Sequence, residues 1–216
     1  LAQELAIKEE QAKAAVQLID EGNTIPFIAR YRKEMTGALN DETLRNLHER
    51  LLYLRNLEEK KEQVINAITD QGKMTEDLKK KILSAETLVA VDDLYRPYRP
   101  KKQTRATKAK EKGLEPLANI LLLQKTTKSM EEEAAAFVNA EKGVANAKEA
   151  IAGAKDIIAE MIADMADYRK SIRNCTMKQG SLVVKAKDEK AESVYEMYYD
   201  FREPLSKVTG YRVLAI

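Results

Sequence analysis

The chain has 216 residues, of which 33% are charged, and its 37 Lys and Arg nearly balance its 35 Asp and Glu, which leaves a net charge of +2. No apolar run approaches the roughly 18 residues that a membrane-spanning helix needs, so the composition excludes a membrane protein and predicts a soluble one. Because the total charge is small, any attraction for a polyanion has to come from the distribution of the charges.

The residue types of most catalytic and metal sites are scarce. The one cysteine, Cys175, excludes an internal disulfide and is compatible with a reducing compartment. The one histidine, His48, belongs to no Cys/His cluster, and a catalytic triad would have to use it. The adjacent acids Asp92 and Asp93 would point apart on a helix and so lack the opposed geometry of an acid/base pair. We therefore predict no metal site, no cofactor and no enzyme activity.

Amphipathic helices are predicted throughout the N-terminal part. The first covers residues 2–21, and the second follows at Thr24, which can cap it. Asn40 is a good cap for a helix running to about Asp70, whose leucines, valine and isoleucines recur every three or four residues. Such a helix is about 45 Å long. Its apolar stripe is covered either by other helices of the chain or by a second copy in a coiled coil.

Further elements follow from local periodicity, caps and glycines. The predicted break at Gly153 and the predicted cap at Asp164 divide a long Ala- and Ile-rich stretch. In chain order we expect a short helix at 75–83, an apolar turn at 88–91, helices at 105–112, 115–121, 129–138, 146–166 and 164–179, a strand at 181–187, a helix at 189–201, and a strand-like end at 211–216.

These elements predict an all-α, multihelical fold with short helix hairpins and one long helix. Minor β structure is expected near residues 181–187 and at the C-terminal edge. We expect two parts, an N-terminal helical domain at 1–128 and a second helical region at 129–216. Because the sequence starts at Leu1 and stops within an apolar run, we also expect it to be a piece of a longer protein.

Charge stops alternating in one place, residues 96–112, called here the basic segment. It holds eight basic residues and one acid, a local charge of +7. Pro97 and Pro100 predict that its first half is extended, and Tyr95 and Tyr98 lie beside them. Basic side chains with interleaved aromatic rings can contact phosphates and stack on unpaired bases. Alternatively, the segment is a charged linker on the surface, pinned by its tyrosines.

Several stretches resemble the N-terminal region of the Tex family of bacterial transcription accessory proteins. They cover nearly the whole chain and comprise residues 24–34 (TIPFIARYRKE), 93–98 (DLYRPY), 101–102, 104–106, 113–118 (GLEPLA), 152–157 and 212–216. One departure is Thr209-Gly210-Tyr211, where the family usually carries a Pro-Ser-His-like run.

The resemblance implies a helical scaffold from a cytoplasmic, nucleic-acid-binding protein related to a eukaryotic transcription elongation factor. It also implies later domains beyond Ile216: an RNase-H-like domain, helix-hairpin-helix elements and a C-terminal OB-fold RNA-binding domain. No catalytic residue is carried over, since the RNase-H-like domain would start after this chain. The implied partners are RNA or DNA, RNA polymerase or ribosome-associated machinery, and the later domains themselves.

Two hypotheses for the function remain. In the first, the chain contacts RNA or DNA without reading sequence. Its candidate binding residues are Tyr95, Arg96, Tyr98, Arg99, Lys101, Lys102, Arg105, Lys108, Lys110 and Lys112, together with Arg30, Arg32 and Lys33. In the second, the chain is a purely structural or protein-interaction scaffold that positions later domains, and the basic segment packs on an acidic neighbour.

Overall fold

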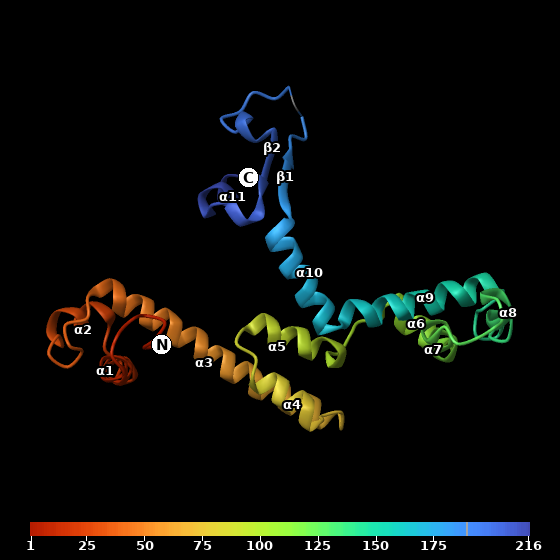
Figure 1. The fold of residues 1–216 in the computed structure, drawn as a ribbon, viewed down its shortest axis with the longest axis horizontal. Coiled ribbons are helices and arrows are strands. Elements are labelled where there is room, and N and C mark those ends of the chain that lie inside the picture. Colours follow the sequence, from red (N-terminus) through yellow and green to blue (C-terminus); the bar gives the residue numbers. More distant parts are fainter. Residues whose placement is uncertain (189) are drawn as a thin grey trace. The chain divides into compact units, whose positions relative to one another are not determined.

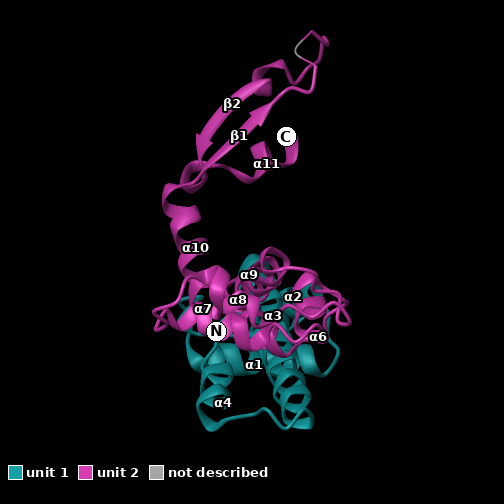
Figure 2. Cartoon of the chain, turned by 90° about the vertical axis from the view of Figure 1, so that its right-hand side faces the viewer, with its two compact units in different colours: residues 1–91 teal, residues 92–216 magenta. Residues whose placement is uncertain are grey.

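A computed structural model describes residues 1–188 and 190–216 (Figure 1). The chain forms two compact units, Leu1–Val91 and Asp92–Ile216 (Figure 2). In the part described, helices dominate, and the one regular sheet is a two-stranded antiparallel pair. This confirms the predicted all-α class with minor β structure.

The first unit is built on one long helix. Helices α1 (Glu9–Asp20), α2 (Ile25–Tyr31) and α4 (Glu76–Leu83) pack on α3 (Asp41–Asp70). The Asn40 side chain caps α3 by accepting a hydrogen bond from the Thr43 amide at 2.7 Å, as predicted.

Helices of the same chain cover the apolar stripe of α3. Leu44 and Leu47 belong to a core shared with α1 and α2, and Val64 and Ile68 are also buried. Lys61, which interrupts the stripe in the sequence, is buried and donates to Glu58 and to the Leu83 carbonyl at the end of α4. A polar residue is therefore accommodated by internal hydrogen bonds, and a coiled-coil partner is not needed to cover the helix.

Two predictions for this unit were wrong. Residues 2–8 are not part of the first helix, because Ala6 has a φ of +51° and α1 starts only at Glu9. The apolar turn expected at 88–91 is instead the start of α5 (Leu88–Tyr95), whose Val91 is fully buried. The apolar residues of so short a run fit a helix as well as a turn.

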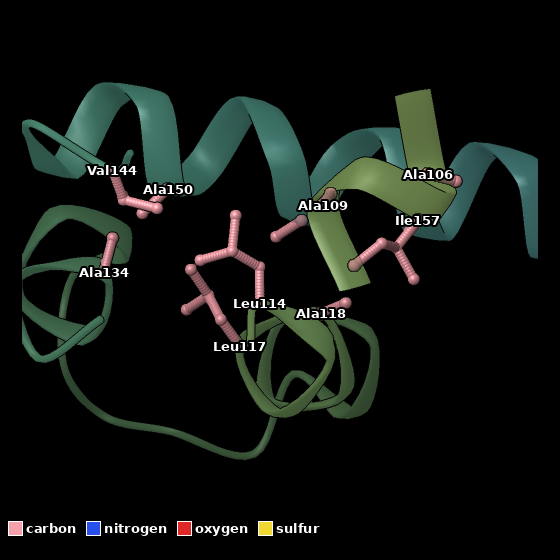
Figure 3. Packing of buried hydrophobic residues seen from close by; sticks show 10 residues of the cluster. Ala106, Ala109, Leu114, Leu117, Ala118, Ala134, Val144, Ala150 and Ile157 are labelled. Atoms are coloured by element: carbon pink, nitrogen blue, oxygen red, sulfur yellow. The ribbon is translucent and has the colours of Figure 1, made fainter. Parts of the chain in front are cut away.

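In the second unit, three short helices pack on α9 (Ala147–Asp164). They are α6 (Arg105–Glu111), α7 (Glu115–Leu123) and α8 (Met130–Ala135), which ends three residues before the predicted 138. The ten buried residues of their shared core include Leu114, Leu117 and Ile157 (Figure 3). Helices α6 and α7 pack on α9, so they belong to the same compact unit, which begins at Asp92. The division into domains at 1–128 and 129–216 stays a prediction.

Gly153 does not break α9, contrary to expectation. A Cβ at this position would lie 2.4 Å from Leu114 Cδ1 and 3.3 Å from Ala109 Cβ. The glycine therefore lets α6 and the start of α7 approach the helix closely, which the sequence pattern alone does not distinguish from a helix break.

Helix α10 (Ala166–Gln179) follows α9 and leads into the sheet. Strand β1 (Ser181–Lys185) pairs with β2 (Asp200–Pro204), with Val183 opposite Arg202. The predicted strand is confirmed, but the helix expected at 189–201 was wrong. The described part of that range instead contains the short 3-10 helix η2 (Glu196–Tyr198) and the start of β2, while Glu189 lies outside the described residues. The backbone N–H and C=O groups of β1 need hydrogen-bond partners, and the backbone of β2 supplies them.

The C-terminal end is helical rather than strand-like. After the 3-10 helix η3 (Leu205–Lys207), α11 (Gly210–Ala215) includes most of the apolar run that suggested a strand. Arg212 of α11 forms an ion pair with Glu203 of β2, so a contact with the sheet holds this short helix.

The close approach at Gly153 generates a prediction. Gly153→Ala should lower the free energy of unfolding by about 1–3 kcal/mol, although alanine favours helices, because Leu114 is buried and has no room to move. Urea denaturation followed by circular dichroism measures this. Gly210→Ala, where no atom lies within 4 Å of the added Cβ, is the control and should leave the stability nearly unchanged. An equally stable Gly153→Ala would contradict the packing.

Candidate nucleic-acid interface

The backbone of the basic segment is only partly extended. Arg96–Tyr98 form the 3-10 helix η1, with Pro97 in its first turn. The chain becomes extended at Arg99 and enters α6 at Arg105. The prediction of an extended first half was therefore wrong for η1, because a proline is compatible with the first turn of a helix.

An acidic row on α9 faces the basic segment. Asp156, Glu160 and Asp164 are four residues apart, which places them on one side of the helix. The Arg96 Nε lies 3.0 Å from Asp164 Oδ1. The Lys101 ammonium lies 3.2 Å from Glu160 Oε1 and also contacts Asp164. The segment is thus tied to α9 by charge-assisted hydrogen bonds.

Asp164, which the sequence predicts to be a helix cap, has a different role in the structure. It is the last residue of α9 and is buried, and Met165 occupies the cap position of α10. Its carboxylate accepts from Arg96 and Lys101 instead of from the backbone of α10. For Lys101, burial alone would lower the pKa, but the hydrogen bonds from its ammonium to Asp164 and Glu160 outweigh burial and raise it.

The start of α6 is fastened to the same row. The Thr104 hydroxyl donates to Glu160 at 2.8 Å and accepts from the Thr107 amide, so it caps α6 while contacting α9. Arg105 is less tightly held. Its Nε lies 3.6 Å from Asp156 Oδ1, and its side chain is 88% exposed.

Other candidate side chains also have partners within the unit. Arg99 donates to Asp92 at 2.9 Å, and its guanidinium lies 5.6 Å from the centre of the Tyr95 ring. The Lys112 ammonium donates to the Gly143 carbonyl at 2.7 Å, and Lys110 lies 3.8 Å from Glu115. Tyr95 and Tyr98 are half-buried and engaged in contacts.

One face of the segment remains open. Lys102 and Lys108 are exposed, and neither has an ion pair or hydrogen bond with another side chain of the described residues. On α6, Ala106 and Ala109 point into the core, while Arg105 and Lys108 lie on the exposed side. We call Lys102, Arg105 and Lys108 the open basic face.

The remaining candidates lie in the first unit. Arg30, Arg32 and Lys33 are exposed at the end of α2, and Arg32 lies over the Phe27 ring, 5.1 Å from its centre. Gln11 anchors the loop that follows by donating to the carbonyl oxygens of Thr36 and Gly37.

Sequence reasoning missed a buried ion-pair site at Asp93. Its carboxylate accepts from Arg169 and from Arg173 of α10, both at 2.6 Å. Burial alone would raise the pKa of Asp93, but the two arginine hydrogen bonds outweigh it and hold the pKa below its usual value. Two arginines four residues apart were the available signal, because they share one face of a helix.

The described residues contain no group of three or more His, Cys, Asp or Glu side chains that could hold a metal ion. Within the same residues, no helix is long and apolar enough to cross a membrane.

Comparison with known proteins defines the class and then the family. Residues 1–69 match the model of the Tex-like protein N-terminal domain, and residues 125–216 match the Tex central region. The chain is therefore a mostly helical protein with the N-terminal and central regions of Tex-like proteins. It belongs to the Tex family.

The relatives agree with this assignment. The chain is 46% identical to protein YhgF of Escherichia coli and 42% identical to the transcriptional accessory protein Tex of Neisseria gonorrhoeae, in each case over all of this chain and 28% of the relative. It is 32% identical to the human S1 RNA-binding domain-containing protein 1, over 93% of this chain and 21% of that protein. The chain thus spans less than a third of the length of these relatives.

The Asp93 site predicts a pH dependence. Because folding lowers the pKa of Asp93, its ion pairs contribute their full stability above about pH 4, the ordinary aspartate pKa. That stability is lost as the pH falls through the pKa that Asp93 has in the folded chain. Asp93→Asn should lower the free energy of unfolding by about 2 kcal/mol at pH 7. The difference in this free energy between the variant and the native chain should shrink towards pH 2. Urea denaturation at both pH values measures it. The control, Asp92→Asn, removes a half-exposed partner of Arg99 and should cost under about 1 kcal/mol.

The acidic row also predicts how the basic segment resists proteolysis. Asp164→Asn should speed trypsin cleavage after Lys101 and Lys102 about fivefold, the factor that roughly 1 kcal/mol of lost anchoring gives. Limited proteolysis with mass spectrometry measures the rate. Asp156→Asn removes only the long contact to Arg105 and should cleave at the native rate. Equal cleavage in the Asp164→Asn and native proteins would show that Asp164 does not anchor the segment.

Proposed function

We propose that the chain is a helical scaffold of a nucleic-acid-binding transcription accessory protein that works in the cytoplasm. Its own contact with RNA or DNA is sequence-independent and is made by the open basic face, with Arg30, Arg32 and Lys33 as a second patch. The proposal assigns no reaction to the chain. Family membership and the name of the human relative, which specifies RNA binding, support it.

One observation carries the division of roles within the basic segment. Arg96 and Lys101 are paired with the acidic row of α9, and Arg99 is paired with Asp92. The carboxylates in contact with these side chains neutralise their charge, so a phosphate that binds them releases fewer counterions and gains less than at an unpaired cation. Their contribution is therefore to hold the fold.

The open basic face has the properties of a phosphate-contacting surface. Its three side chains are exposed, their positive charges are unpaired or loosely paired, and α6 is anchored at Thr104. Lysine and arginine heads on a fixed backbone contact phosphates without reading bases, because base edges lie in the grooves. This geometry favours binding that releases counterions and depends steeply on salt.

A protein-binding role is the second candidate, with RNA polymerase or ribosome-associated machinery as the proposed partner. Its support is the apolar surface that the end of α7 exposes, which includes Leu122 and Leu123. An exposed group of large apolar side chains is typical of an interface.

The nucleic-acid proposal predicts a salt-dependent affinity that the open basic face supplies. Fluorescence anisotropy with labelled single- and double-stranded oligonucleotides measures it across a salt series. Three phosphate contacts should weaken duplex binding roughly 40-fold over a fourfold rise in salt. The triple variant Lys102→Gln, Arg105→Gln, Lys108→Gln should lose most of this slope, because it removes all three contacts.

The matched control changes Lys73, Lys79 and Lys80 to Gln, which removes the same charge from exposed positions of the first unit. It should retain the native slope. If the two triple variants bind alike, net charge and not the open basic face supplies the affinity. If the native chain does not bind at low salt, it has a scaffold role alone.

A further inference from the structure

Helix α10 is incompletely covered. None of its 14 residues is buried, although it packs on α9 at one end and on η3 at the other. A helix of this length is only marginally stable in water without tertiary packing. Its exposed side chains include Tyr168 and Ile172, and Ile172 is 66% exposed. A surface of this kind is suited to packing against another structure.

Two parallel rows of side chains divide the surface of α10. Arg169 and Arg173 form one row, and both are held by Asp93. Tyr168 and Ile172 form the neighbouring row, again four residues apart. Together with Ile162 of α9, the two rows line one shallow depression. The depression therefore has apolar walls and a cationic edge of fixed position.

We propose that this depression, called here the α10 face, is the docking site of the polypeptide that follows position 216 in full-length proteins of the family. It deepens the scaffold role proposed above by naming the surface and its occupant. The occupant presents apolar side chains to Tyr168, Ile172 and Ile162, and carboxylates at the arginine edge would complement it.

The length of the relatives supports this occupant. The matched part is at most 30% of the length of the relatives, and residues 1–69 match an N-terminal domain, so most of the length of each relative follows the matched part. That remainder is large enough to supply a packing surface. Because it is covalently attached, its effective concentration at the α10 face is high.

The path of the chain also supports it. Helix α11 is paired to β2 through Arg212 and Glu203, and η3 packs on α10, where the Leu205 amide donates to the Gly180 carbonyl. The polypeptide therefore leaves Ile216 from the substructure that is built on the end of α10. A following segment can reach the α10 face without a long connection.

Hydrogen–deuterium exchange of the full-length protein tests the proposal. Amides 170–176 of α10 should exchange at least tenfold more slowly in the full-length protein than in residues 1–216. In the full-length protein, Ile172→Glu should remove this protection, because it places a charge in the apolar row. Met177→Glu is the matched control. Met177 is 56% exposed on the same helix, about 140° around its axis from Ile172, and its substitution should leave the protection intact.

The outcomes separate the possible occupants. Equal exchange in the full-length protein and in residues 1–216, or equal effects of the two substitutions, would overturn the proposal. Protection that rises with the concentration of residues 1–216 would replace it with a second copy of this chain. Protection on adding an oligonucleotide would replace it with nucleic acid. Ile172→Glu leaves the open basic face unchanged, so the variant should bind oligonucleotides with the native affinity whether or not the α10 face is a docking site. Measuring that affinity therefore distinguishes failure of this proposal from failure of the proposed nucleic-acid binding.

Discussion

The second unit depends on the match between the acidic row of α9 and the basic segment. Asp164 and Glu160 hold Lys101, and Glu160 also accepts from the Thr104 hydroxyl that caps α6. These contacts fix the segment between α5 and α6 and bring α6 against α9, where Gly153 leaves room for Leu114. Electrostatic pairing and close packing therefore position the same pair of helices.

That pairing changes what a cluster of positive charge means. A local charge of +7 in the sequence predicts a polyanion-binding segment. In the fold, carboxylates pair with several of these cations, and only Lys102 and Lys108 are exposed with side chains that have neither an ion pair nor a hydrogen bond within the described residues. Within this segment, the division between structural and available cations follows from distance to a carboxylate, not from residue type.

The two units use polar residues in buried places for the same purpose. Lys61 joins α3 to the end of α4, and Asp93 joins α5 to Arg169 and Arg173 of α10. Each buried charge is satisfied by more than one hydrogen bond, so it fixes which helices meet at little net cost. The apolar core determines that the helices pack, and these contacts select the arrangement.

The sequence by itself determined the helical class, the bounds of α3 and α4, the capping box before α8 and the strand β1, because caps and periodicity act over a few residues. It did not determine β2, α11 or the continuity of α9 at Gly153. Nor did it show that Asp164 neutralises the basic segment. Only the tertiary structure decided these, because a strand partner, a close helix approach and an ion pair join residues far apart in the chain.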